Sequence, residues 1–256
     1  MNWFNMEDII PKGRDKYRIQ SDNLDGYSNL KISSLLQIFQ ESAERQATSI
    51  GLDQKELRSQ DLCYILSRIN IVIDEMPILD SEVTLVTWPK SSDDQFLYRD
   101  FLLFNSSNLD KPIIRATSAW SLINIESRRA QKIELVAGSI PVSDEIFAIK
   151  EHPAKVDALP CAWNHSSGLV NSSDVDVDGN VKNTRYFEWI SDVYSQEHYS
   201  EMIIGTLDIN FLAEAVLGDV YKINMASKGK GIYLNNVVRE SDQKELVRTR
   251  TQWIKR

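Results

Sequence analysis

Apolar residues recur along this chain with two different periods, and the two periods alternate in blocks. From about residue 35 to residue 50 they fall three and four positions apart, which predicts one amphipathic helix. Strict alternation then predicts four strands, at about 62–75, 82–89, 94–105 and 112–125. The apolar face of this helix consists of Leu35, Leu36, Phe39, Ala43, Ala47 and Ile50.

The second half of the chain repeats this order. A second apolar stripe at helical spacing begins at Tyr186 and continues through Ile190 to Tyr194. Alternating segments follow at about 201–214, 219–228, 231–239 and 245–254. Residues 68–85 can also be laid on residues 206–223 without a gap, so that Ile69 matches Leu207. We therefore expect an α+β unit, one helix on an antiparallel sheet, made twice.

Residues 130–162 separate the two halves and show weak periodicity. This stretch contains Pro141, Pro153 and Pro160, which is typical of a linker rather than of a helix or strand. We take domain boundaries at 1–135 and 163–256, with residues 136–162 as the linker.

Composition places the protein among ordinary globular chains. Of its 256 residues, 42% are hydrophobic and 26% are charged, and the formal net charge is −8. No apolar run reaches the roughly 18 residues of a membrane span, and the first residues lack the pattern of a signal peptide. We expect a cytoplasmic protein with no membrane and no nucleic acid partner.

Cysteine and histidine are scarce, which limits the chemistry. Cys63 and Cys161 lie in different halves, so a disulfide framework is not expected. Three histidines leave little material for a zinc site or a Ser-His-Asp triad. We predict neither a metal nor a cofactor.

An acidic run at 174–183 is the main candidate for chemistry. Asp174, Asp176, Asp178 and Gly179 fill the first four defining positions of a calcium loop. The twelfth position, which should supply a bidentate glutamate, is instead Arg185. A calcium-binding module is therefore a minor alternative.

Two other interpretations of the same run stay open. It precedes the second helix, so its side chains could simply cap that helix as a solvated turn. The free amides and positive dipole end of the helix also suit a carbonyl oxygen that gains negative charge during a reaction.

Several short motifs resemble the acyl-acyl carrier protein thioesterases, in order and over most of the chain. In the second half these are the corner Asp174-Val175-Asp176, Tyr186-x-x-Trp189, residues 211–214 and Gly218-Asp219. In the first half they are residues 35–43, 65–68, 87–89 (Thr-Trp-Pro), 98–101 (Tyr-Arg-Asp-Phe), 116–120 and 127–129.

The resemblance implies a fold and a site. The fold would be α+β, two fused hotdog domains. Family members activate water and polarise the thioester with an Asp, an Asn, a His and a Glu, which would correspond here to Asp176, Asp178, Asn180 and Glu214. The usual Asp-x-Asn-x-His corner is thus altered at two positions. Ala215 stands where plant members carry a cysteine, so a Cys-His mechanism is excluded.

The altered corner has predictable consequences. Asn180 keeps an N–H donor but loses the proton-transfer capacity of histidine. Asp178 adds a carboxylate near two other acids, so we expect like-charge repulsion to raise at least one carboxyl pKa. Hydrolysis needs only a base for water and a donor for the oxyanion, which these residues retain.

The function that the resemblance implies is hydrolysis of fatty acyl-acyl carrier protein to free fatty acid. The acyl chain would lie in the first half, against the helix residues Leu35, Leu36 and Phe39. Because carrier proteins are acidic, docking would need a local basic patch. The candidates are Lys182, Arg185, Arg128 and Arg129. Alternatives are an acyl-CoA thioesterase or an acyl-binding protein without turnover, and the quaternary state is left open between monomer and homodimer.

Overall fold

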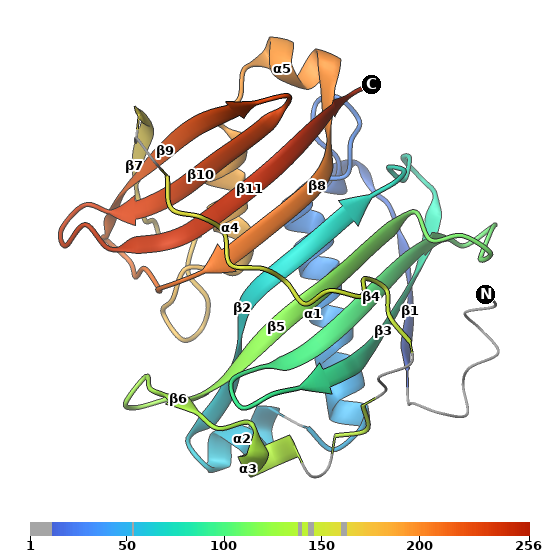
Figure 1. Ribbon diagram of the computed structural model, residues 1–256, viewed down its shortest axis with the longest axis vertical. Helices are drawn as coiled ribbons and strands as arrows, with labels where there is room; N and C mark the ends of the chain where they lie inside the picture. The colour runs from blue at the N-terminus through green and yellow to red at the C-terminus, as the bar shows by residue number, and fades with distance from the viewer. Residues whose placement is uncertain (1–11, 53, 138–139, 143–145, 160–162) are drawn as a thin grey trace.

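The computed structural model describes residues 12–52, 54–137, 140–142, 146–159 and 163–256 (Figure 1). It contains one large antiparallel sheet whose strands run in the order β1-β3-β4-β5-β2-β8-β11-β10-β9-β7, with β6 beside β5. The helices lie on one face of this sheet, and the linker crosses the other (Figure 1). The strands are β1 (Gly13–Arg18), β2 (Leu62–Ile73), β3 (Glu82–Ser92), β4 (Leu97–Asn105), β5 (Ile114–Asn124), β6 (Ala130–Gln131), β7 (Trp163–Leu169), β8 (Met202–Phe211), β9 (Val220–Gly229), β10 (Ile232–Arg239) and β11 (Glu245–Lys255).

The helices divide between the two halves in the same way. The first half has α1 (Ile32–Ser49) followed by the short α2 (Gln54–Ser59), and the second has α4 (Asn183–Ser191) followed by α5 (Gln196–Glu201). A single 3-10 turn (Ser21–Asn23) precedes α1, and α3 (Glu134–Ala137) begins the linker. Reading the sheet outward from its centre gives β2-β5-β4-β3-β1 on one side and β8-β11-β10-β9-β7 on the other. The two halves therefore have one topology, as the sequence predicts.

The apolar stripes explain why the helices pack where they do. Leu35, Leu36 and Ile190 are fully inaccessible to solvent, in one core that both halves share. Burying each such side chain contributes about 1.5–3 kcal/mol relative to leaving it in water. The helices α1 and α4 pack against each other behind the sheet (Figure 1), so the main core is shared by both halves, and two smaller clusters lie in the first half with part of the linker.

The halves join where β2 pairs with β8. Asn70 lies opposite Asp208, and its Nδ2 donates to Asp208 Oδ1 at 2.7 Å. On either side of this pair, Ile69 faces Ile209 and Ile71 faces Leu207, so equivalent apolar residues of the two units meet at the centre. The junction is thus a continuous antiparallel ladder rather than a flexible connection.

A buried ion pair fixes the linker to the outer face of β3 and β4. Lys90 Nζ lies 3.8 Å from Asp100 Oδ1 and donates to the carbonyl of Ile149 at 2.5 Å. Asp100 Oδ2 accepts from the backbone N–H of Ala148 at 2.7 Å. Burial raises the pKa of Asp100 to about 6, and burial lowers the pKa of Lys90. Contacts that compensate two buried charges therefore hold residues 148–151 of the linker against the sheet.

The observed elements follow the predicted ones closely, and their ends differ from the predicted ends by at most three residues. The first helix begins at Ile32 rather than at 35, β8 ends at Phe211 rather than at 214, and β4 begins at Leu97 rather than at 94. At β4, Asp93 Oδ1 accepts the amides of Gln95 and Phe96, both at 2.8 Å, and so forms a turn where alternation predicts strand. The edge strands β1 and β7 were not predicted, because Gly13–Arg18 and Trp163–Leu169 carry too few apolar residues to alternate.

Candidate active site

The acidic run forms a tight loop immediately before α4. Asp176 Oδ1 accepts the backbone amides of Asp178 at 2.9 Å and of Asn180 at 3.2 Å. The loop closes through the Asp176 amide, which donates to the Asn180 carbonyl at 2.8 Å. Gly179 adopts φ of +81°, in the left-handed region that favours glycine. One carboxylate oxygen of Asp176 thus holds the loop, and the other is left for further contacts.

Glu214 reaches the same loop from the end of β8. The loop pairs with the segment after Glu214, since the Val181 amide donates to the Ala215 carbonyl at 2.9 Å and Asn180 bridges to Val216. The Ala215 amide donates to the hydroxyl of Tyr186 at 3.0 Å, which fixes the segment on α4. Burial raises the pKa of Tyr186 to about 12, so its hydroxyl is neutral and remains an acceptor.

Two arginines of the first half complete the site. Arg58, on α2, forms a two-pronged ion pair with Asp178, with Nη2–Oδ2 at 2.5 Å and Nη1–Oδ1 at 3.1 Å. Arg128, after β5, forms an ion pair with Glu214. Asp178 and Glu214 of the second half are therefore each matched by a cation of the first, and the site spans the boundary between the two units.

These arginines lower the pKa of one of the three crowded acids. The hydrogen bond and charge of Arg58 lower the pKa of Asp178, and Arg128 acts in the same direction. The expectation that mutual repulsion raises at least one carboxyl pKa of this group does not hold for Asp178, where the direction is the opposite, and it stays a prediction for the other two acids. The sequence shows three acids close together, but it does not show that two guanidinium groups from the other half lie among them.

Cys63 lies beside the same charges, at the start of β2. It is half-buried, and burial raises the pKa of its thiol although Arg128 and Arg58 oppose that shift. A neutral thiol is a poor nucleophile, so this cysteine does not replace the one that plant family members carry. The other cysteine, Cys161, lies outside the described residues.

The geometry supplies the parts that thioester hydrolysis requires. Glu214 is a half-buried carboxylate fixed at the loop, where it can accept a proton from water. Within the described part of the chain the Asn180 side chain makes no hydrogen bond, so its N–H donor can face a substrate oxygen. The first amides of α4 begin just after Lys182 and add positive potential at the same corner.

A calcium site finds less support. Asp174 is buried and paired with Arg185 Nη2 at 2.7 Å, and Asp178 is paired with Arg58. Among the residues that the structure describes, no group of three or more His, Cys, Asp or Glu side chains is arranged to hold a metal ion. The twelfth position of the presumed loop, Arg185, instead neutralises its first.

The predicted acyl-chain residues lie in the core. Leu35 and Leu36 are fully buried, and Phe39 stacks on Phe101 with ring centroids 4.5 Å apart. None of them lines the mostly apolar cavity of about 280 Å³ that lies at the other end of α4. Their role in holding an acyl chain stays a prediction.

The four predicted docking cations differ in how their charge is used. Arg128 is paired with Glu214, and Arg185 is paired with both Asp174 and Glu188. Lys182 is exposed and donates to the Ser173 carbonyl at 3.3 Å, and Arg129 is also exposed. Arg58 was not predicted as a site residue. Its only sequence signal is a cation on a short helix, which carries no indication of a partner 120 positions away.

This arrangement, two helix-on-sheet units sharing one sheet with an acidic corner at their boundary, is the double-hotdog fold. The model of the acyl-ACP thioesterase N-terminal domain matches residues 12–137, and that of the acyl-ACP thioesterase C-terminal domain matches residues 164–255. The chain belongs to the acyl-ACP thioesterase family.

Known proteins similar to this chain agree with that assignment. It is 25% identical to the palmitoyl-acyl carrier protein thioesterase of Arabidopsis thaliana, over 94% of this chain and 63% of the relative. It is 26% identical to the enzyme of that name from Gossypium hirsutum, over 93% of this chain and 62% of the relative. The chain thus spans a little over three fifths of the length of these plant relatives.

Solved structures confirm the fold. An acyl-ACP thioesterase from Bacteroides thetaiotaomicron superposes with a TM-score of 0.87 at 23% identity, covering 95% of this chain and 98% of that one. The 12:0-ACP thioesterase from Umbellularia californica gives 0.86 at 22% identity, covering 96% and 98%. The fold predicted from the resemblance, α+β with two fused hotdog domains, is confirmed.

Proposed function

We propose that this protein hydrolyses the thioester of fatty acyl-acyl carrier protein and releases free fatty acid. The observation that carries the proposal is the position of Glu214, which the fold brings to the Asp176–Asn180 loop in a chain whose two halves both match the family. The first domain, 1–135, would hold the acyl chain along α1, and the second, 163–256, would carry the reaction, with 136–162 as the linker.

The proposed reaction uses a water molecule and no protein nucleophile. Glu214, and Asp176 through its second oxygen, accept the proton of water while the water oxygen attacks the carbonyl carbon. Asn180 and the first amides of α4 stabilise the resulting oxyanion. The carbon–sulfur bond then breaks, the thiolate leaves and takes up the proton, and the fatty acid is released. Arg128 and Arg58 keep Glu214 and Asp178 in position before substrate arrives.

Docking of the acidic carrier protein would then depend mainly on Lys182 and Arg129. The charges of Arg128 and Arg185 are already balanced within the chain. Within the described ranges no helix is long and apolar enough to cross a membrane. We propose that the substrate reaches the corner from water, attached to its carrier.

The first test is hydrolysis of acyl groups of several lengths on acyl carrier protein and on coenzyme A, followed by thiol release. We expect hydrolysis of the carrier-protein substrates and a fall in kcat of about 10²- to 10⁴-fold in Glu214→Gln. Asp176→Asn should also lose activity, because the amide keeps the acceptor oxygen that holds the loop but removes the charge.

The matched control is Glu240→Gln, which breaks an ion pair of similar exposure, with Lys222 at 2.7 Å, away from the corner. It should retain full activity. Full activity in Glu214→Gln would remove this residue from the mechanism. A folded wild-type protein that hydrolyses none of the substrates would refute the proposed function, and a preference for coenzyme A would reassign the substrate.

A further inference from the structure

The loop before α1 repeats the backbone and its hydrogen bonds to aspartate seen in the loop before α4; in addition, Asn29 Nδ2 donates to the Asp25 carboxylate. Both read Asp-x-x-x-Asn followed by an apolar residue and Lys, at 25–31 and at 176–182. Asp25 Oδ1 accepts the amides of Tyr27 at 2.8 Å and Asn29 at 2.9 Å, as Asp176 Oδ1 does in the other half. The Asp25 amide donates to the Asn29 carbonyl at 2.8 Å, which is the distance found between Asp176 and Asn180.

The backbone between these anchors also agrees. Ser28 adopts φ of +63° where Gly179 adopts +81°. The N-cap residues Lys31 and Lys182 have φ/ψ of −60°/135° and −59°/137°. A β-bridge joins Leu24 to Leu30 in the first half and Val175 to Val181 in the second. The corner assigned to catalysis therefore has a structural duplicate in the first unit.

The surroundings of the two loops correspond as well. The pairing of β2 with β5 skips Ser67 beside Trp120, and the pairing of β8 with β11 skips Gly205 beside Trp253. In both units the indole Nε1 of this tryptophan donates to a hydroxyl two residues earlier, at 2.8 Å and 3.0 Å. Counted from these bulges, the position that corresponds to Glu214 in the first unit is Met76.

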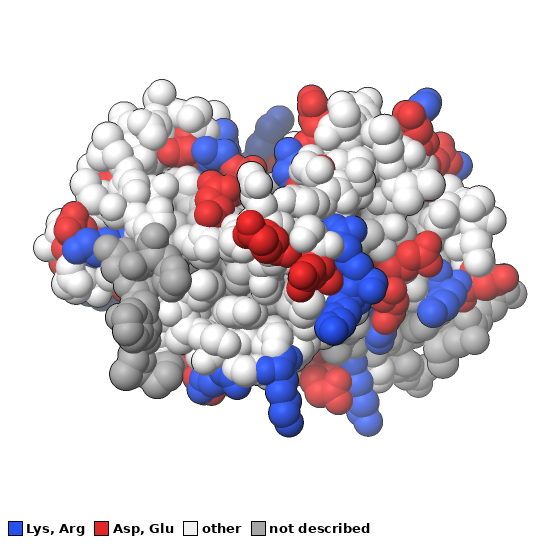
Figure 2. Space-filling view, turned by 90° about the horizontal axis from the view of Figure 1, so that it is seen from above, with Lys and Arg blue, Asp and Glu red and all other residues white. Residues whose placement is uncertain are grey.

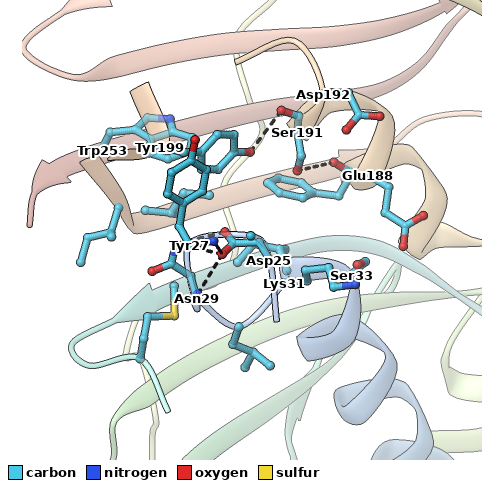
Figure 3. A pocket seen from close by; sticks show the side chains of 17 residues that line it. Asp25, Tyr27, Asn29, Lys31, Ser33, Glu188, Ser191, Asp192, Tyr199 and Trp253 are labelled. Atoms are coloured by element: carbon cyan, nitrogen blue, oxygen red, sulfur yellow. Dashed lines mark hydrogen bonds between the residues drawn. The ribbon is translucent and has the colours of Figure 1, made fainter. Parts of the chain in front are cut away.

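A cavity of about 280 Å³ lies beside this second loop (Figure 3). Asp25 and Tyr27 border it from the loop, and Met76 stands at the place equivalent to Glu214. The C-terminal end of α4 contributes Ser191, and β11 contributes Trp253. Figure 2 shows this end of the molecule, where charged side chains are interspersed around a broad uncharged area. The cavity and the acidic corner thus lie at opposite ends of α4.

The chemistry of the cavity indicates what it can hold. Most of its wall is apolar, from Leu30, Ile32, Met76, Phe187, Ile204 and Trp253. An apolar cavity of about 150 Å³ accepts benzene, so this one has room for roughly ten to twelve carbon atoms. Methionine cannot accept a proton from water, so the base that Glu214 supplies in the other half is missing.

The charges at the rim restrict the polar end of the ligand. Asp25, Glu188 and Asp192 border the cavity, with Lys31 as the cation among them. Burial and the negative charge of the neighbouring Glu188 raise the pKa of Asp192, so a negative charge at this rim is unfavourable. A free fatty acid carboxylate would be repelled there, whereas an uncharged ester or thioester would not.

We propose that this cavity is a second acyl-binding site, which holds an uncharged acyl or alkyl thio-group of about ten carbons without hydrolysing it. The site is the counterpart of the acidic corner on the other side of the pseudo-symmetric fold. Two features distinguish it from the corner. Met76 stands where the corner has the carboxylate of Glu214, and Tyr27 stacks on Tyr199, with ring centroids 5.9 Å apart, where the corner has the Asp178–Arg58 ion pair. The proposal draws on the proposed function only for the kind of ligand.

The test is the number of ligands bound per chain, measured by calorimetry with S-decyl-pantetheine. This probe is a neutral thioether that cannot be hydrolysed, so its binding is independent of turnover. We expect two molecules per wild-type chain and one in Met76→Trp and in Ser191→Phe, which fill the cavity from two different elements. Ile78→Trp is the matched control, because Ile78 follows Met76 in the same loop but is 71% exposed. It should still bind two.

A bromine-labelled form of the probe, in crystals of the unmodified protein, gives a readout that does not depend on any variant. Anomalous density beside Met76 and Trp253 would support the second site. One bound probe that survives in both cavity-filling variants would overturn it, as would density at the acidic corner alone. A third outcome is that the wild-type chain binds one probe, that both cavity-filling variants bind none, and that the density lies in the cavity. This outcome would support the second site and would count against an acyl pocket at the corner.

Discussion

The acidic corner is assembled from side chains of both halves. Asp178 and Glu214 of the second half are each paired with an arginine of the first, Arg58 and Arg128. Asp176 differs from both, because one of its oxygens is used to hold the backbone. Its counterpart Asp25 does the same where no base is present, so the loop-forming role of this aspartate is independent of catalysis. A substitution that removes both roles at once, such as Asp176→Ala, would not separate them.

The lowered pKa of Asp178 predicts how stability changes with pH. Because its folded pKa lies below the unfolded value of about 3.9, its pairing with Arg58 stabilises the protein above that pH and is lost as pH falls through the folded pKa. Both side chains are 43% exposed, so solvent screening limits the contribution to about 0.5 kcal/mol. We expect Asp178→Asn to lower the free energy of unfolding by that amount near pH 7, in urea titrations.

The same comparison near pH 3 separates this ion pair from other effects of the substitution. The difference between wild type and Asp178→Asn should narrow there, since the wild-type carboxyl is then becoming neutral as well. Asp80→Asn, at the more exposed pair with Arg18, serves as a control for losing a surface charge. A difference that stays constant from pH 7 to pH 3 would show that Asp178 acts on stability through something other than its charge.

At the scale of elements, the hydrophobic pattern was sufficient to predict the two main helices, α1 and α4, and the central strands, but not the loops and the edge strands. In strands such as β2 and β8, apolar and polar residues alternate because one face of each strand is buried, so the sequence itself indicates which side chains are buried. The strand β1 pairs with β3 through its backbone. Its side chains alternate between half-buried and exposed, but most of them are polar or charged, so no apolar alternation marks the strand in the sequence. The loop Asp25–Lys31 was equally readable in the sequence, as a second Asp-x-x-x-Asn followed by Lys, but its significance depends on hydrogen bonds that no periodicity shows.

The partners of the site residues were the least predictable feature. Whether an arginine on α2 contacts an aspartate before α4 depends on how the two units pack. The hydrophobic pattern along either unit does not predict that contact. The lowered pKa of Asp178 follows from the same contact, so its direction could not be predicted from the three neighbouring acids alone.

The duplicated loop allows a matched test of backbone strain. In the left-handed region a residue with a Cβ costs about 1–2 kcal/mol, whereas glycine does not. Gly179→Ala should therefore destabilise the protein by about 1 kcal/mol, and Ser28→Gly should change stability by less than that or raise it, because Ser28 already bears the cost at φ +63°. Guanidinium unfolding of both variants gives the comparison. Equal losses at the two positions would mean that contacts of the side chains, not φ, decide the outcome.

At the scale of the whole molecule, the two units are separate in sequence but continuous in structure. The ladder of β2 with β8 makes one sheet, and the shared core includes residues of both α1 and α4. The linker adds a third connection, because Lys90 and Asp100 fix it to the first unit and Asn210 Oδ1 accepts from the Val156 amide in the second. The acidic corner depends on this continuity, since Arg58 and Arg128 reach it only when the units are packed together.

This continuity predicts a single cooperative unfolding transition, although the chain holds two copies of one fold. Opening one unit would expose the apolar pairs Ile69–Ile209 and Ile71–Leu207 at the junction and remove half of the core on which the other helix packs. In differential scanning calorimetry we expect one peak with a calorimetric enthalpy equal to the van't Hoff enthalpy. Asp208→Ala, which removes the acceptor of Asn70 at the pseudo-symmetry axis, should lower Tm without splitting the peak. Two resolved transitions in the wild-type protein would mean that each unit is stable without the other, and that the site at their boundary can open while both remain folded.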